Sequence, residues 1–447
     1  MPMVNSQTKP SYRPAFAIDS LLNFGTQLSI FALAFVSTLI IARALGPHGK
    51  GLYSFVILIP TLLANCLNMG INFSNVYFIG QKEHSVNCIV GNTISFSLLL
   101  GLSITLIFFV MITYPQLHFF ANIQTRYLYI TFPILPFILV LDSINSTLLG
   151  NRKIAKLSAV RLVKSSTYLT CLLLIFYLST TSVYNVIFAY IAGILAAIII
   201  GSYFLITTRY FTGFVFNKLL IKQMLKFGLK QHLGSVCQIL NYRIDMLIVV
   251  YLLTETDLGL YSIAVVVAEM IWYLPNSIGQ ILYAKVASET HRLPSSFTPL
   301  VCRIVIFIIF LGCATLYALS AFAIPYLFTF RFTPSVPPLK LLLPGVIFLS
   351  VSKILGSHLT GLGFPQYSTL ASAISLVATI LFDFLLIPLF GINGAAFASS
   401  ISYMINCFVV LYFFKSVSGV AVTDTLFIKT SDYLEFRRIL RTLRQSS

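Results

Sequence analysis

The chain has 447 residues, of which 58% are hydrophobic and only 9% are charged, and its mean hydropathy is +0.92. A soluble domain carries roughly 25% charged residues, so this composition excludes a water-soluble globular protein and indicates one that folds within a lipid bilayer. The formal net charge of +17 fits basic loops that face anionic lipid, and it gives no argument for nucleic-acid binding.

Apolar stretches follow one another along almost the whole chain. A transmembrane helix needs about 20 mainly apolar residues, and we predict twelve such spans, with little sequence left between them for a soluble domain. They cover residues 16–42, 52–80, 88–113, 126–150, 157–178, 183–206, 227–252, 258–284, 301–327, 338–361, 366–388 and 391–414. We therefore expect an all-α, polytopic membrane protein.

Lysine and arginine are distributed unevenly between the two sides of these spans. The side that carries both termini holds most of them, including the basic loop 207–226 and the tail 415–447. The opposite side carries only Arg43, Lys50, Arg126, Arg331 and Lys340. Because basic loops stay on the cytoplasmic side, the sequence predicts that both termini are cytoplasmic.

A short repeat divides the chain into halves. The segment Gly51-Leu52-Tyr53-Ser54, at the start of the second span, returns as Gly259-Leu260-Tyr261-Ser262 at the start of the eighth. This spacing predicts two pseudo-symmetric lobes of six helices around a central cavity, where a substrate can be exposed to each side in turn. The predicted parts are an N-terminal tail (1–15), an N-lobe (16–206), a basic linker (207–226), a C-lobe (227–414) and a basic tail (415–447).

Several motifs resemble one known family. Residues 43–53, Arg-Ala-Leu-Gly-Pro-His-Gly-Lys-Gly-Leu-Tyr, are similar to the "ARxLGPxGxGxY" segment of the polysaccharide transporters, the Wzx-type oligosaccharide flippases of the MOP superfamily. Residues 245–248 with 258–264, 359–363 and 385–396 resemble later helices of the same family.

The resemblance implies a transporter and no enzyme. Its members carry oligosaccharides linked to a polyprenyl pyrophosphate, of the undecaprenyl type, from the cytoplasmic to the outer leaflet of the cell inner membrane. This transport serves the biosynthesis of surface polysaccharides such as the O-antigen of lipopolysaccharide. Anionic lipids and the polysaccharide polymerase or assembly proteins are the partners expected from this resemblance.

An anionic substrate of this kind calls for cations within the spans. The sequence places Arg161 and Lys164 in the fifth span, Lys230 and Arg243 in the seventh and Lys353 in the tenth. A charge at the bilayer centre costs about 2.5–3.5 kcal/mol on insertion scales, so such residues face a cavity or a partner. Near the cytoplasmic boundary their side chains can instead reach the headgroups. The deeper pair, Arg243 and Lys353, are the best candidates for the lumen.

Carboxylates within the spans are candidates for coupling transport to H⁺ or Na⁺. Glu269 and Asp245 are the strongest, Asp142 is a third, and Asp383 the weakest, because its span is otherwise apolar. The alternative is that each one pairs with a lumen cation. Arg243 and Asp245 are two positions apart, on different faces of the helix, so each needs another partner. The seven cysteines lack metal-ligand spacing, so no metal and no other cofactor is expected.

Two other functions fit the hydropathy. A drug or cation antiporter of the related MATE type would need a lumen dominated by carboxylates, whereas these spans hold at least as many cations. A membrane-embedded glycan polymerase or ligase would need a long external loop with reactive groups, and the external loops here are short. At the C-terminus, residues 432–444 predict a basic amphipathic helix that lies on the cytoplasmic leaflet.

Overall fold

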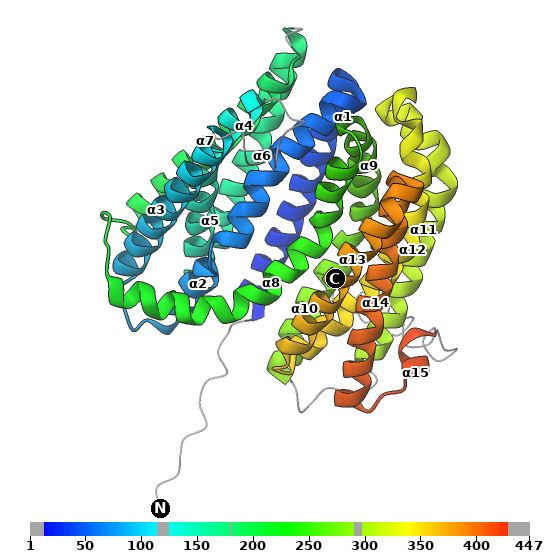
Figure 1. The fold of residues 1–447 in the computed structure, drawn as a ribbon. Coiled ribbons are helices and arrows are strands. Elements are labelled where there is room, and N and C mark those ends of the chain that lie inside the picture. The colour runs from blue at the N-terminus through cyan, green and yellow to red at the C-terminus, as the bar shows by residue number, and fades with distance from the viewer. Residues whose placement is uncertain (1–12, 114–124, 179–180, 290–296, 428–447) are drawn as a thin grey trace, which may run out of the picture. The chain divides into compact units, whose positions relative to one another are not determined.

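The computed structural model describes residues 13–113, 125–178, 181–289 and 297–427 (Figure 1). Within these ranges every regular element is a helix, and eleven helices are long and apolar enough to cross a membrane. The all-α fold is thus confirmed, and the chain is a multi-pass membrane protein.

The helices group into two compact units. The first contains the chain up to residue 41 together with Leu67–Leu229, and the second contains Ala42–Cys66 together with the chain from Lys230 onward. This grouping differs from the predicted lobes in one segment, because residues 42–66 pack with the second unit. The division into six-helix lobes remains a prediction.

Helix α1 (Arg13–Leu67) contains the first two predicted spans. Its apolar part, Phe24–Leu67, is 44 residues long, about twice what one crossing needs. Gly46 interrupts the helix with φ 67° and ψ −176°, and Pro47 follows it. A positive φ is open to glycine at little cost, and proline is well suited to begin a helix. The two spans therefore lie on either side of Gly46.

The second predicted span, 52–80, needs a correction. The structure breaks it at Asn68–Gly70, where Gly70 has φ 73° and donates its N–H to Asn68 Oδ1 at 2.8 Å. The separate short helix α2 (Ile71–Gln81) follows this turn. Hydropathy averaged over the span missed the break because the apolar residues on both sides outweigh Asn68 and Gly70 at the turn.

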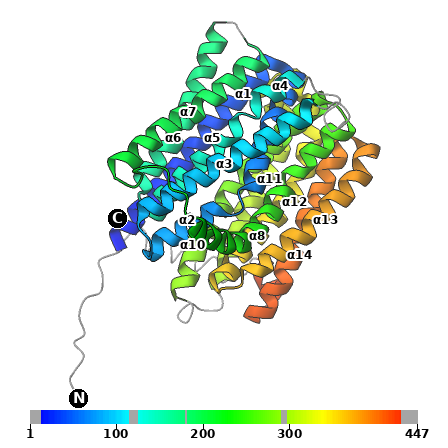
Figure 2. The ribbon, with the colours of Figure 1, turned by 60° about the vertical axis from the view of Figure 1, so that its left-hand side comes forward.

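The first unit is built on close helix pairs. Helix α3 (Val86–Thr113) packs against α5 (Ile134–Gly150), which follows α4 (Thr125–Thr131), and α6 (Ile154–Tyr177) lies beside α7 (Val183–Thr207) (Figure 2). A buried amide side chain of α2 donates hydrogen bonds to α5.

The donor of these hydrogen bonds is Asn75 Nδ2. It lies 2.8 Å from Ser146 Oγ and 2.9 Å from Thr147 Oγ1. Such hydrogen bonds hold helices together where lipid provides no hydrophobic driving force.

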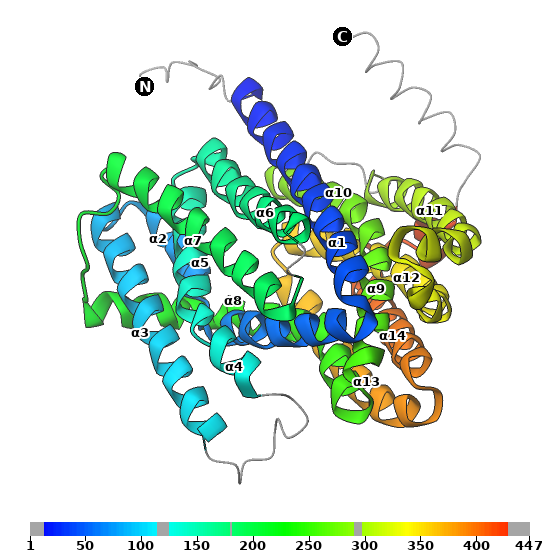
Figure 3. The same ribbon diagram turned by 90° about the horizontal axis from the view of Figure 1, so that it is seen from above.

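The second unit carries the remaining helices. In the view of Figure 3, α12 lies between α11 and α14, and α13 packs on α14. The elements are α8 (Lys218–Leu252, from Lys230 onward), α9 (Glu255–Glu269), η2 (Met270–Trp272), α10 (Tyr273–Glu289), α11 (Phe297–Phe328), η3 (Phe330–Ser335), α12 (Val336–Gly361), α13 (Pro365–Phe390), α14 (Ile392–Ser418) and α15 (Val422–Leu426).

The two copies of the Gly-Leu-Tyr-Ser repeat contact each other within the second unit. A Cβ atom on Gly51 would overlap the carbonyl oxygen of Glu255, and one on Gly259 would overlap that of Pro47. Each glycine thus lets the other copy's backbone approach closely. This contact is a physical reason why residues 42–66 group with the second unit.

The described chain ends soon after α15, which packs on α11. The guanidinium of Arg303 on α11 donates to the carbonyl oxygen of Asp424 on α15. The predicted amphipathic helix 432–444 lies outside the described residues and stays a prediction.

Candidate functional site

A break between α9 and α10 brings polar residues into the second unit. Pro275 lacks the N–H that would bond to the carbonyl of Ile271, so the α-helical ladder cannot continue, and a turn of 3₁₀ helix, Met270–Trp272, bridges the gap. Glu269 closes α9 on one side of this break and Asn276 lies just beyond it on α10. Both side chains face residues of other helices.

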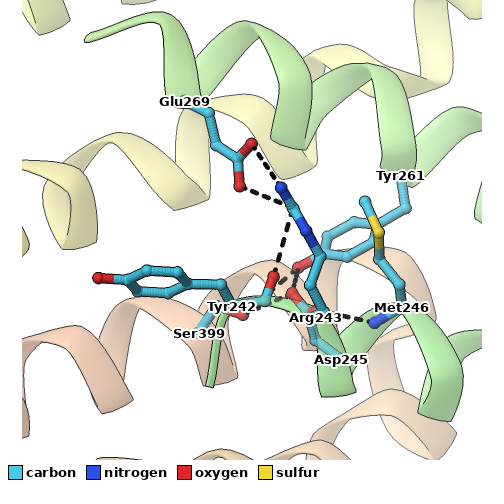
Figure 4. Close-up of polar contacts among 7 residues, drawn as sticks. All are labelled: Tyr242, Arg243, Asp245, Met246, Tyr261, Glu269 and Ser399. Atoms are coloured by element: carbon cyan, nitrogen blue, oxygen red, sulfur yellow. Dashed lines mark hydrogen bonds and ion pairs between the residues drawn. The ribbon is translucent and has the colours of Figure 1, made fainter. Parts of the chain in front are cut away.

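Glu269 forms a bidentate ion pair with Arg243 of α8 (Figure 4). Arg243 Nη1 lies 2.7 Å from Glu269 Oε1, and Nη2 lies 3.1 Å from Oε2. A fork of two parallel N–H donors on one carboxylate is the strongest geometry for such a pair. The side chains keep 34% and 20% of their surface exposed, so neither group is fully enclosed by protein.

Lys353 of α12 lies within electrostatic range of Glu269, but its direct contacts are with uncharged groups. Its Nζ donates to Asn276 Oδ1 at 2.8 Å, and it lies 4.6 Å from the ring centroid of Trp272 and 5.2 Å from that of Tyr242. Among the described residues, no carboxylate oxygen lies within 4.0 Å of Nζ. Aromatic faces stabilise an ammonium group but leave its charge in place. The cluster of Arg243, Glu269 and Lys353 thus has a net positive charge.

Asp245 lies on a different face of the helix from Arg243, and its carboxylate is hydrogen-bonded to other residues. It is 2% exposed and accepts hydrogen bonds from Tyr261 Oη at 2.6 Å, from the backbone N–H of Met246 at 2.7 Å and from Ser399 Oγ at 3.2 Å (Figure 4). The expectation that Arg243 and Asp245 need different partners is met by these contacts.

A polar seam continues from Asp245 between α8 and α13. Asn241 lies one turn before Asp245, and its amide contacts Ser375 Oγ at 3.0 Å and Thr379 Oγ1 at 2.6 Å. Asp383 follows Thr379 by one turn of α13, is 0% exposed and interacts electrostatically with Asp245. Neither of its carboxylate oxygens has a hydrogen-bond partner among the described residues.

The remaining predicted residues lie elsewhere. In the first unit, Asp142 of α5 interacts electrostatically with Lys164 and Arg161 of α6, and Lys164 Nζ also lies 5.4 Å from the ring centroid of Tyr190. Lys230 belongs to the second unit and is exposed. Within the second unit the structure brings Arg243, Lys353 and Glu269 together, and within the first unit it brings Asp142 near Arg161 and Lys164. The functional role of each stays a prediction.

Sequence reasoning did not find Asn241, Thr379 or Asn276. The first two had a usable pattern, because Asn241 and Asp245 on one span, and Ser375, Thr379 and Asp383 on another, recur every four residues and so line one helical face. Asn276 had no such pattern, and only the tertiary contact with Lys353 identifies it.

The sequence matches a known protein family. Residues 18–283, more than half of the sequence, match the family described as polysaccharide biosynthesis protein. The chain belongs to this family. The resemblance to polysaccharide transporters is thereby confirmed, and the matched region includes Arg243 and Glu269 but ends before Lys353.

One sequence relative and several solved structures are similar to this family member. It is 24% identical over 271 residues to an uncharacterised membrane protein of Methanocaldococcus jannaschii, and the match covers 58% of this chain and 53% of that protein. The chain thus spans about half the length of that relative.

The solved structures show the same fold. A structure of the lipid II flippase MurJ has a TM-score of 0.74 at 17% identity, covering 94% of this chain and 93% of that one. An inward-facing multidrug resistance MATE transporter of the MOP superfamily has a TM-score of 0.69 at 15% identity, covering 90% and 98%. A MOP-superfamily transporter of Pyrococcus furiosus has a TM-score of 0.64 at 13% identity, covering 90% of this chain and 94% of that one. The reversed polarity of its binding pocket suggests a different function for that protein.

Proposed function

We propose that this protein is a flippase for lipid-linked oligosaccharides in surface polysaccharide biosynthesis. Its substrate is a repeat unit on a polyprenyl pyrophosphate of the undecaprenyl type, which it moves by alternating access from the cytoplasmic to the outer leaflet of the inner membrane. Both termini are cytoplasmic. O-antigen of lipopolysaccharide is one such polymer, and polymerase or assembly proteins would take up the translocated units.

The observation that supports this proposal best is the net positive cluster of Arg243, Lys353 and Glu269. Where water is largely excluded, a pyrophosphate group must be neutralised by cations. The guanidinium group of Arg and the ammonium group of Lys are the usual phosphate ligands. Here Lys353 has no carboxylate partner among the described residues, so its charge is available to an anion. Membership of a polysaccharide biosynthesis family adds independent support.

The MATE-like antiporter remains the competing function because the fold is shared. A cationic drug would meet two cations against one carboxylate at this cluster and would be repelled. For the Pyrococcus furiosus transporter, the reversed polarity of the binding pocket suggests a different function. By that criterion the cluster favours an anionic substrate.

The polar seam supports coupling to a small cation. An unpaired ionised carboxylate in a buried site is strongly disfavoured, so Asp383, with no hydrogen-bond partner among the described residues, would carry a proton or hold a Na⁺ ion. Asp245, Thr379 and Ser399 offer further oxygen atoms nearby on α8, α13 and α14. We place the coupling ion, H⁺ or Na⁺, at Asp383 and Asp245 in preference to Asp142 and to Glu269, both of whose oxygens are bound by Arg243.

The deciding experiment is genetic complementation. A bacterium that lacks its own flippase for a defined surface glycan receives this gene, and one measures the surface polymer and the exposure of lipid-linked units on the outer leaflet. Restored polymer is the expected result for at least one glycan of a panel. Failure across the panel, with the protein well expressed and drug efflux increased, would replace the flippase with the antiporter.

A further inference from the structure

Glu269 acts on both cations of the cluster. Both of its carboxylate oxygens are bound by the guanidinium fork of Arg243, and it is also the carboxylate that interacts electrostatically with Lys353. One negative charge therefore balances two positive charges. The pair is partly exposed, with 34% of the Arg243 side chain and 20% of the Glu269 side chain accessible.

A guanidinium group presents the same two N–H donors to a carboxylate and to a phosphate. A phosphate that binds Arg243 in the fork geometry must take the positions now held by the oxygens of Glu269. The two anions cannot share these donors, since like charges at contact distance repel.

We infer that Glu269 is a displaceable counterion, which a substrate diphosphate replaces on Arg243 while Lys353 holds the second phosphate. The inference rests on the proposed function and adds a mechanism to its site. The ion pair neutralises Arg243 when the site is empty, and Glu269 returns to the guanidinium when the head group leaves. Binding of the diphosphate and binding of Glu269 to Arg243 are then reciprocal: whatever strengthens one weakens the other.

Other groups around Glu269 do not compete for this role. The titratable and charged groups that act on it are Tyr242 and Arg243 of α8, Tyr273 of α10, Lys353 of α12 and Tyr403 of α14. None of these is a carboxylate. Asp245 also acts on Arg243, but its oxygens are held by Tyr261, Ser399 and the Met246 N–H. Removing the Glu269 carboxylate therefore tests only the competition between Glu269 and the diphosphate for Arg243.

The chain carries its own reporter for this site. Trp272 is the single tryptophan of the sequence, and its ring centroid lies 4.6 Å from Lys353 Nζ. Intrinsic tryptophan fluorescence of the purified full-length protein in detergent therefore reports the surroundings of Trp272, which include Lys353. Farnesyl diphosphate is a suitable probe because it has a diphosphate on a short isoprenoid tail, and farnesol controls for binding of the tail.

The decisive comparison is between Glu269→Gln and the matched control Glu255→Gln. Both changes remove one negative charge from α9, but Glu255 lies at the first turn of the helix, away from the cluster. We expect Glu269→Gln to bind farnesyl diphosphate about tenfold more tightly than the wild type, a gain of about 1.4 kcal/mol, because the competitor is gone. Glu255→Gln should bind like the wild type, and Arg243→Gln should bind more weakly.

A structural role for Glu269 predicts the opposite sign. If Glu269 only holds Arg243 in place, Glu269→Gln binds the probe as weakly as or more weakly than the wild type, and the inference is overturned while the proposed function stands. If Glu269→Gln does not yield folded protein, Glu269→Asp tests the same point, because its shorter side chain cannot keep both contacts and should also tighten binding.

The wild type separates the remaining outcomes. A protein that restores surface polymer but shows no fluorescence response to farnesyl diphosphate binds the head group elsewhere, which overturns the inference alone. A protein that shows neither response nor restoration overturns the proposed function and the inference together.

Discussion

At the scale of single residues, the charge of Lys353 is held by one amide oxygen and two aromatic rings. Desolvating an ammonium group in this way is costly unless an anion completes the site. The same arrangement keeps the side chain in place, since it packs against Trp272 and Tyr242. These contacts hold the charge of Lys353 in a fixed position, as the proposed binding of an anionic substrate requires.

Replacing Lys353 with methionine removes the charge but keeps most of the side-chain volume. We expect Lys353→Met to lower the rate at which surface polymer is restored by about tenfold or more, which corresponds to at least about 1.4 kcal/mol. Lys340→Met is the control, because Lys340 lies on the same helix and at the same 4.6 Å from an aromatic centroid, that of Tyr317. Equal activity of the two variants, at equal expression, would show that the charge at Lys353 is dispensable.

The two carboxylates of the seam should respond in opposite ways to replacement by asparagine. Asp245 accepts three hydrogen bonds, so Asp245→Asn loses acceptor capacity and should lower the melting temperature in detergent by several degrees, for a loss of about 1–3 kcal/mol. Asp383 has no hydrogen-bond partner among the described residues, so Asp383→Asn should keep or raise the melting temperature.

Transport measurements complete this test. In proteoliposomes with an imposed H⁺ or Na⁺ gradient, Asp383→Asn should abolish the acceleration of flipping by that gradient, because asparagine can neither release a proton nor supply a negative charge to a cation. An Asp383→Asn protein that still responds fully to the gradient would remove this residue from the coupling site.

Much of the site could be predicted at the residue scale, but not its connections. The rarity of charges in apolar spans singled out Arg243, Lys353 and Glu269 individually. Their contact depends on how α8, the break at Pro275 and α12 pack in three dimensions, which no spacing in the sequence records. Asp383 was ranked last because its neighbours in sequence are apolar, whereas its neighbours in space are the polar residues of α8.

At the scale of helices, hydropathy predicted the spans because length and apolar composition are what a bilayer selects. It did not locate the breaks, since an interruption at Gly46 or Asn68–Gly70 changes backbone dihedrals without changing hydropathy. That the Gly-Leu-Tyr-Ser repeat marks equivalent positions of two halves stays a prediction, and the close backbone contact between its copies is known only from the structure.

The contact between the repeats predicts an unequal response to alanine. A methyl group on Gly51 or Gly259 would overlap a backbone carbonyl, so the helices must separate, at a cost of about 1–3 kcal/mol for overpacking. Gly51→Ala and Gly259→Ala should each lower the melting temperature in detergent. Gly312→Ala on α11 is the control, because its added methyl meets nothing within 4 Å and alanine favours the helix by up to about 1 kcal/mol. Equal melting temperatures for all three variants would argue against the contact.

At the scale of the whole molecule, two long helices each contribute to both compact units. The boundaries fall within α1, between residues 41 and 42, at the end of α1, between residues 66 and 67, and within α8, between residues 229 and 230. Any movement of one unit against the other must therefore be accommodated by these helices or by the turn at Asn68–Gly70, where the backbone already departs from helical geometry. The proposed alternating access therefore predicts bending within these helices in addition to movement of loops.

The direction of transport depends on how the molecule is oriented, and the charges of its loops predict that orientation. The segment 207–226, which includes the first turns of α8, carries Arg209, Lys218, Lys222 and Lys226, whereas the segment 114–124 carries no lysine or arginine. Since basic loops resist translocation, the first should be cytoplasmic and the second external. An epitope inserted at Gly213, where an added Cβ atom would meet nothing within 4 Å, should stay hidden from antibody in intact spheroplasts, and one inserted within 114–124 should be accessible. Activity of both insertion variants in the complementation assay ensures that the labelled molecules are folded. The reverse pattern of labelling would invert the membrane orientation and with it the proposed direction of flipping, while leaving the cationic cluster and its anionic ligand unchanged.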